Sequence, residues 1–117
     1  MTSVSDSVVA SGLAIAQVYA LDADPAWLPL QSVQSFDAVL ADVRWPEGAR
    51  CLLDAARAAS VPTVFDGDVG APDALRDLSG RCDYAIFSTP GLALATGTRD
   101  PAEGLRCALG FTTAVIS

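Results

Sequence analysis

The sequence predicts an α/β domain with a mainly parallel sheet, arranged as a three-layer α/β/α sandwich. Short apolar runs bounded by Pro, Gly or Asp alternate with segments of helical periodicity, the pattern of consecutive β-α units. The nearly continuous apolar character of these runs is typical of strands buried on both faces of a sheet. Right-handed crossovers would place successive strands side by side, with helices covering the sheet. The runs are Ala38–Asp42, Thr63–Asp66, Tyr84–Ser88 and Thr113–Ser117.

The amino-terminal segment carries weaker signals. Residues 1–11 are rich in serine and small residues and are expected to form a loose leader, so that a single domain covers 12–117. A further strand is predicted over Leu13–Ala20, although its alanines weaken the pattern. Asp24 is a candidate N-cap and Pro25 a candidate first residue of a short helix that follows.

Four helices are predicted between and after the central strands. Proline at or near the start of each segment suits the first helical turn, where its missing N–H is not needed. Gly80 and Gly97 are placed as C-caps, and Asp100 as an N-cap. The longest helix has arginine and aspartate three and four residues apart on its polar face, which predicts a solvated surface with weak ion pairs. The predicted helices are Pro46–Ser60, Pro72–Ser79, Pro90–Ala95 and Asp100–Gly110.

Composition excludes several classes of function. The net charge is −7 with no histidine, and the seven basic residues are all arginines scattered singly. Binding to nucleic acid or to an anionic membrane surface is therefore not expected. Without histidine there is no conventional Ser-His-Asp triad, and no residue is assigned a catalytic role. The apolar segment 8–21 has no preceding positive charge and is interrupted by Gln17, so neither a signal peptide nor a membrane span is expected, and a cytoplasmic location follows.

The three cysteines show neither close pairing nor the spacing of a zinc site. Cys51 and Cys107 fall in predicted helices and Cys82 just precedes a predicted strand. We therefore expect reduced, mostly buried thiols in a reducing compartment, and no metal site built from them.

The sharpest local motif is the acidic turn that follows the second central strand. Asp66 and Asp68 flank a glycine there and could bind Mg²⁺ or a sugar hydroxyl; the alternative is an acidic turn with a merely structural role. An Asp66-dependent phosphotransfer or phosphatase reaction is disfavoured. Haloacid-dehalogenase phosphatases, receiver domains and P-loop proteins all use a lysine, and this chain has none.

Two further groups of polar residues follow strands of the predicted sheet. Asp42 and Arg44 lie at the end of the first central strand and are candidates for a ligand or dimer surface, or else a loop cap and a solvated side chain. Ser88 and Thr89 lie between a strand end and a helix start and form either an anion site or a simple cap. Because ligands of parallel sheets collect at the carboxyl ends of the strands, all these residues are expected at one edge.

Taken in order, these segments resemble the middle of the ribokinase-like sugar kinases, also called PfkB carbohydrate kinases. The resemblance covers roughly 27–117 and rests on order and spacing. A strand ending in Asp-Val-Arg-Trp-Pro-Glu and a helix precede Val-Pro-Thr-Val-Phe-Asp-Gly-Asp. A strand, Leu-Ala-Thr-Gly, a helix and a final strand follow. The Asn-x-x-Glu that family members usually carry is replaced by Ser88-Thr89-Pro90-Gly91, and their catalytic Gly-Ala-Gly-Asp turn does not occur in the 117 residues.

The resemblance implies transfer of a phosphoryl group from ATP, with Mg²⁺, to a hydroxyl of a sugar or sugar-like molecule. Asp42, Arg44, Asp66 and Asp68 would lie on the substrate side, and Ser88 and Thr89 on the phosphate side. We expect a truncated, inactive fragment, able to form a homodimer through open sheet edges. The alternative is a non-catalytic α/β module that binds a small ligand or a partner.

Overall fold

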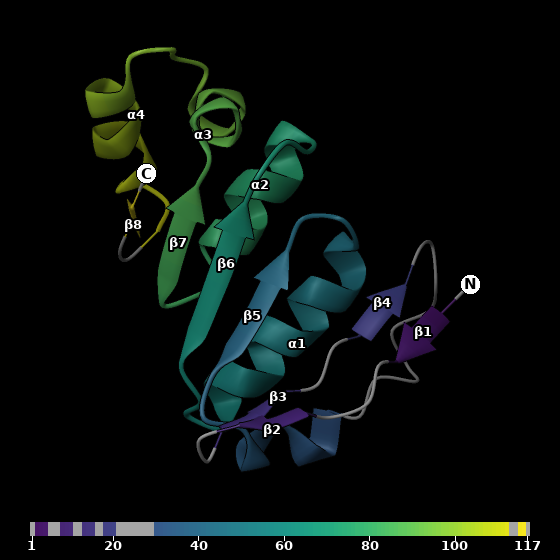
Figure 1. Ribbon diagram of the computed structural model, residues 1–117. Coiled ribbons are helices and arrows are strands. Elements are labelled where there is room, and N and C mark those ends of the chain that lie inside the picture. Colours follow the sequence, from purple (N-terminus) through teal and green to yellow (C-terminus); the bar gives the residue numbers. More distant parts are fainter. Residues whose placement is uncertain are drawn as a thin grey trace.

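The centre of the molecule is a four-stranded parallel sheet with strand order β5-β6-β7-β8 (Figure 1). The computed structural model describes residues 2–4, 8–10, 13–15, 18–20, 30–112 and 115–116. The mainly parallel α/β class and the sequential strand order predicted from the sequence are confirmed. The strands are β5 (Val39–Asp42), β6 (Thr63–Gly67), β7 (Tyr84–Phe87) and β8 (Val115–Ile116).

The four predicted helices are present, and each carries a proline in its first turn. The last turn of α3 ends at Gly97, whose φ of 80° is the left-handed conformation that glycine adopts without strain. Gly80 is the C-cap residue of α2, as predicted, but its φ of −76° keeps it right-handed. The helices are α1 (Pro46–Ala58), α2 (Pro72–Ser79), α3 (Thr89–Thr96) and α4 (Pro101–Ala108), and a 3₁₀ helix, η2, covers Leu30–Ser35.

The amino-terminal segment differs from the prediction. The expected single strand over 13–20 is two strands, which pair antiparallel with strands from residues 2–10 rather than joining the central sheet. Division of the chain at residue 12 stays a prediction, and Asp24 and Pro25 lie outside the described residues. The strands are β1 (Thr2–Val4), β2 (Val8–Ala10), β3 (Leu13–Ile15) and β4 (Val18–Ala20).

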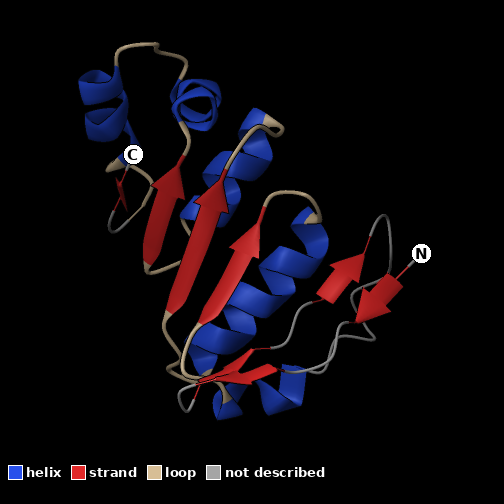
Figure 2. Cartoon of the chain, in the orientation of Figure 1, coloured by secondary structure: helices blue, strands red, loops and turns tan. Residues whose placement is uncertain are grey.

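The two faces of the central sheet differ in burial, which corrects the expectation of strands buried on both sides. Burial alternates along β5 and β7, and in Figure 2 β5 and β6 lie in front of α1 and α2, which pack behind the sheet. We call the side toward these helices the covered face; it carries Val39, Ala41, Thr63, Phe65, Gly67, Ala85 and Phe87. The other side is the open face; it carries Leu40, Asp42, Val64, Asp66, Tyr84 and Ile86.

The main core lies between the covered face and the helices. Phe65 and Phe87 meet edge to face, with ring centroids 6.4 Å apart and an interplanar angle of 84°. This arrangement contributes about 1 kcal/mol beyond the area that the two rings bury. Leu53 of α1 and Leu75 and Leu78 of α2 are completely buried against the sheet. Both helices lie on the same face because the strands follow one another in sequential order and the crossovers are right-handed.

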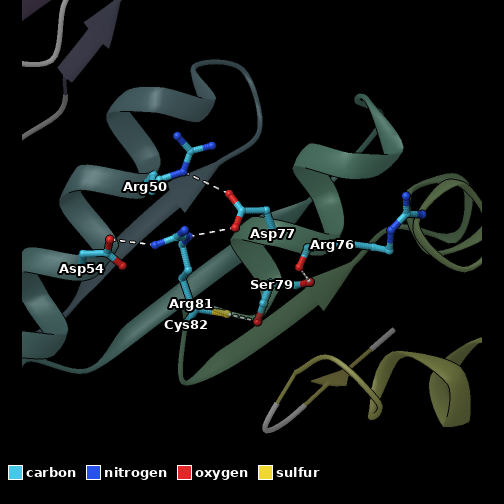
Figure 3. A network of polar contacts seen from close by, with 7 residues as sticks. All are labelled: Arg50, Asp54, Arg76, Asp77, Ser79, Arg81 and Cys82. Atoms are coloured by element: carbon cyan, nitrogen blue, oxygen red, sulfur yellow. Dashed lines mark hydrogen bonds and ion pairs between the residues drawn. The ribbon is translucent and has the colours of Figure 1, made fainter.

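Charged side chains join α1 to α2 on the outside of this core (Figure 3). Arg50 Nε donates to Asp77 at 3.1 Å, and Arg81 reaches both Asp77 at 2.9 Å and Asp54 at 2.7 Å. The sequence predicts pairing within α1 instead. The partners come from another helix because the crossover places the polar edges of α1 and α2 beside each other, which periodicity within one helix does not reveal.

Partial burial would raise the pKa of Asp77, but hydrogen bonds from Arg81 and Arg50 outweigh it and hold that pKa below its ordinary value. The same network raises the pKa of Arg81 through its hydrogen bonds to Asp77 and Asp54.

The cysteines are free, as expected, but they are not uniformly buried. Cys82 is buried and its burial raises the thiol pKa, Cys51 is half-buried, and Cys107 is exposed on α4. Among the described helices, none combines the length and the apolar character needed to cross a membrane.

Candidate functional site at the carboxyl edge of the sheet

The polar residues singled out in the sequence converge at the carboxyl ends of β5, β6 and β7. Parallel register sets Asp42 opposite Asp66, and Gly67 opposite Phe87. The next residues along the chain, Asp68 and Ser88, therefore leave neighbouring strands at the same level. This is the position at which open α/β sheets bind ligands.

Asp68 and Ser88 form the best-defined contact of this edge. The Ser88 hydroxyl donates to Asp68 Oδ1 at 2.8 Å and accepts from the backbone N–H of Gly91 at 3.1 Å. Ser88 is thus the N-cap of α3, and the Asp68 carboxylate lies one hydrogen bond beyond it. The hydrogen bond from Ser88 lowers the pKa of Asp68, with further lowering from the N–H of Val69 and the charge of Arg44. Asp68 is therefore ionised at neutral pH.

Two glycines allow the backbone of α3 to approach the end of β6 closely. A Cβ atom on Gly91 would overlap the carbonyl oxygen of Gly67, so only glycine lets the first turn of α3 rest against the end of β6. At Gly67 itself a Cβ would meet the Phe87 ring at 2.5 Å. The close approach of these two backbones is what brings the Ser88 hydroxyl to Asp68. Its sequence signals are a serine N-cap with glycine three residues later and a glycine at a strand end.

Asp42 and Arg44 form a local pair at the end of β5. The backbone N–H of Arg44 donates to Asp42 Oδ1 at 3.0 Å, and Arg44 Nε lies 3.7 Å from Asp42 Oδ2. The carboxylate thus caps its own loop, as one of the two sequence interpretations holds. The Arg44 side chain is 80% exposed, and its charge acts on Asp68 as well. Among the described residues, Arg44 is the cation at this edge whose charge acts on Asp68.

Asp66 and Thr89 are not drawn into these contacts. Asp66 lies on the open face and is exposed, and within the described part of the chain no hydrogen bond or ion pair engages its carboxylate. Thr89 is exposed on the first turn of α3. The structure therefore gathers Asp42, Arg44, Asp68 and Ser88 and leaves these two at the margin.

This edge is an open surface rather than an enclosed pocket. A groove of about 590 Å³ lies instead between α1 and α2. It is lined by three residues of the network in Figure 3, Arg50, Asp77 and Arg81, together with Ala71, Asp73 and Ala74. The described residues contain no group of three or more acidic, histidine or cysteine side chains that could hold a metal ion. The edge can thus offer hydrogen-bond acceptors and one guanidinium, the chemistry that recognises hydroxyl groups.

Comparison with solved structures identifies the architecture. A protein of Agrobacterium tumefaciens assigned as a ribokinase matches with a TM-score of 0.66 and 32% identity, over 80% of this chain and 32% of its own. A PfkB protein from Polaromonas sp. JS666 matches with a TM-score of 0.70 and 19% identity, over 87% of this chain and 42% of its own. No protein-family model matches the chain.

The chain therefore has the ribokinase-like fold of PfkB carbohydrate kinases over the matched part, which confirms the sequence-based resemblance. It spans between about a third and two fifths of the length of these structures.

Proposed function

We propose that this chain is a fragment of an ATP-dependent sugar kinase and supplies part of its sugar-binding surface. The observation that carries the proposal is the match to the Agrobacterium tumefaciens protein assigned as a ribokinase, at 32% identity over 80% of the chain. The complete reaction would transfer the terminal phosphoryl group of ATP to a sugar hydroxyl. The unpaired cysteines support a reducing compartment, so the proposal includes a cytoplasmic location.

On the substrate side, the proposal assigns Asp42, Arg44, Asp66 and Asp68 to the sugar. Ionised carboxylates accept hydrogen bonds from vicinal hydroxyls, and the lowered pKa of Asp68 keeps it an acceptor down to acidic pH. Arg44 supplies a donor between Asp42 and Asp68 and limits the repulsion between them. Since the edge is exposed, we expect weak, hydroxyl-directed binding.

On the phosphate side, Ser88 and Thr89 are proposed by the family resemblance alone. The Ser88 hydroxyl already holds Asp68 and Gly91, and a carboxylate beside the start of α3 repels a phosphate group. The described residues also contain no group of three or more acidic, histidine or cysteine side chains that could hold a metal ion. They do not fit ATP and Mg²⁺ without further groups, and we derive no chemical step from them.

Sugar binding is tested by NMR titration of the chain with a panel of pentoses and hexoses. Asp68→Asn removes the central acceptor, and Asp37→Asn is a matched control because Asp37 is exposed and precedes β5 at the opposite end of the strand. The proposal predicts chemical-shift changes around Asp68 that Asp68→Asn abolishes and Asp37→Asn preserves. Binding that survives Asp68→Asn would contradict the assignment of the edge.

The engaged Ser88 hydroxyl also favours the second candidate, a non-catalytic module that binds a small ligand or a partner. Incubation with ATP, Mg²⁺ and each sugar, followed by ³¹P NMR, addresses both candidates. We expect no phosphorylated sugar from the chain alone, because its 117 residues contain no Gly-Ala-Gly-Asp. Turnover would show that the fragment is active. Failure of every sugar to bind would favour the module.

A homodimer through an open sheet edge is part of the same proposal. The outer edge of β5 has no partner strand among the described residues, so its backbone groups are available to another chain. Light scattering over a range of protein concentrations measures the association directly, and a mass that stays monomeric at high concentration would contradict it.

A further inference from the structure

The groove between α1 and α2 brings together two arginines that are far apart in the sequence. Arg50 lies in α1 and Arg81 follows α2, yet both guanidinium groups donate to Asp77 (Figure 3). Arg50 Nε contacts one carboxylate oxygen of Asp77 at 3.1 Å, and Arg81 Nε contacts the other at 2.9 Å. Asp77 therefore orients both guanidinium groups in the groove that they line.

Each of these guanidinium groups keeps donors that the protein does not use. Arg81 Nη1 donates to Asp54 at 2.7 Å. Within the described residues, no hydrogen bond engages Arg81 Nη2 or either terminal nitrogen of Arg50. The Arg50 side chain is 44% exposed and the Arg81 side chain 33%, so a ligand can reach both. The groove thus offers N–H donors beside a carboxylate whose two oxygens are already engaged.

The size and the lining of the groove suit a small organic anion. Its volume of about 590 Å³ lies within the range of small-molecule sites, roughly 300–1,000 Å³. The terminal nitrogens of a guanidinium group match the oxygens of a carboxylate or phosphate group. Ala71 and Ala74 add apolar surface beside the arginines. Asp73 also lines the groove, and its charge is balanced by an ion pair with Arg76.

We propose that this groove binds a small organic anion, whose carboxylate or phosphate group accepts hydrogen bonds from the terminal nitrogens of Arg50 and from Arg81 Nη2. The short carbon chain of the ligand lies against Ala71 and Ala74, and Asp77 is a positioning residue for the two guanidinium groups. The chain carries a net charge of −7 and repels anions in general, so binding would reflect these local donors. The groove shares no residue with the proposed sugar site, and the inference does not depend on that site.

The test uses three small probes. Propionate represents the carboxylates, inorganic phosphate represents the phosphate group, and propionamide has nearly the shape of propionate without its charge. Each probe is titrated into the complete chain at constant ionic strength. ¹H–¹⁵N NMR follows the Arg81 Nε–H and the backbone N–H of Ala74, and the change of shift with concentration gives a dissociation constant.

Two substitutions at one position separate hydrogen bonding from charge. Arg50→Gln removes a guanidinium group and leaves Arg81 to hold Asp77, whereas Arg50→Lys keeps the charge but loses the planar pair of terminal nitrogens. Arg106→Gln is the matched control, because Arg106 is exposed on α4 and does not line the groove. Circular dichroism establishes that all three variants are folded.

We expect at least one of the two anions, and not propionamide, to bind the native chain. Arg50→Gln should weaken that binding by about tenfold, as expected for the loss of a charge-assisted hydrogen bond. Arg50→Lys should weaken it by about threefold, because a point charge replaces the fork of donors. Arg106→Gln should leave it unchanged. Binding of propionate alone would identify the ligand as a carboxylate, and binding of phosphate alone would identify it as a phosphate.

Four outcomes overturn the proposal. If neither anion saturates the groove, the network serves only to join α1 to α2. Equal binding of propionamide would remove the role of the anionic group, and equal weakening by Arg50→Gln and Arg106→Gln would show attraction by overall charge. Native affinity in Arg50→Lys would exclude the contact through the terminal nitrogens. None of these variants alters a residue of the carboxyl edge, so the result is distinguishable from that of the sugar titration.

Discussion

The covered and open faces of the central sheet are built by the same strands yet differ in what packs against them. Phe65, Ala85 and Phe87 on the covered face are 0–3% exposed and meet the helices. On the open face Leu40 and Tyr84 keep half or more of their surface in water. Apolar residues on a strand thus do not by themselves produce a core, because burial requires a second element with a matching apolar stripe.

The difference in burial also separates residues that stabilise the fold from residues that remain available for binding. The covered face supplies the hydrophobic burial that holds α1 and α2 in place. The open face contributes little to folding and remains available to ligands. Substitutions on the covered face should therefore lower the free energy of unfolding, whereas substitutions on the open face should leave it nearly unchanged.

The largest expected effect comes from a matched pair of leucines. Leu53→Ala on α1 removes a fully buried side chain beneath the covered face and should lower the free energy of unfolding by about 2–5 kcal/mol. Leu40→Ala on the open face should change it by about 0.5 kcal/mol or less. Urea denaturation followed by circular dichroism measures both. Similar losses for the two variants would show that the open face is packed in solution.

A second pair tests the junction between the covered face and the carboxyl edge. In Gly91→Ala the new methyl group collides with a backbone carbonyl that cannot move, so we expect a loss of about 2–3 kcal/mol. In Gly104→Ala on α4 the methyl group meets the Leu92 side chain at 3.0 Å, which can shift. That change should stay within about 1 kcal/mol, since alanine also favours the helix. Thermal unfolding distinguishes them, and a harmless Gly91→Ala would refute the close approach to Gly67.

The cap of α3 should show an intermediate effect that links structure to the candidate site. Ser88→Ala removes the N-cap oxygen and should cost about 1 kcal/mol. It also deletes the first donor to Asp68, so the pKa of that carboxyl should rise toward its ordinary value of 3.8. An NMR titration of Asp68 in both proteins measures this rise. Ser35→Ala is the control, because that exposed hydroxyl donates to Ser32 O and not, among the described residues, to a carboxylate. An unchanged Asp68 titration would contradict the hydrogen bond.

The smallest effect concerns the ion pairs on the outside of the helical layer. Because the pKa of Asp77 is lowered by folding, its contribution is present above its ordinary value of 3.8 and is lost as the pH falls through the lower folded value. Asp77→Asn should therefore cost about 0.5–1 kcal/mol near pH 7 after allowance for solvent screening. The cost should shrink toward zero in strong acid and at high salt. Urea denaturation at several pH values measures it, and a cost independent of pH would point to a steric effect.

Much of the fold was predictable because local signals agree with one another. α2 begins and ends at the predicted residues, Pro72 and Ser79, since a proline opens an apolar helical stripe that Gly80 closes. The strand before Asp66 was recognised by its β-branched and aromatic residues. The amino-terminal strands were less predictable, because short alanine-rich runs do not indicate which strand they pair with.

The sequence by itself determined the order of strands and helices, the acidic balance, and the presence of polar residues at successive strand ends. These properties follow from periodicity, capping and composition, which act within a few residues along the chain. Only the tertiary structure decided that Ser88 holds Asp68, that Arg81 joins α2 to α1, and that Leu40 and Tyr84 remain exposed. Each of these depends on the register of the parallel strands and on which face the crossover helices occupy. The two contacts join residues 20 or more positions apart, and the exposure of the two apolar side chains reflects the lack of such contacts among the described residues. No local pattern in the sequence encodes either feature.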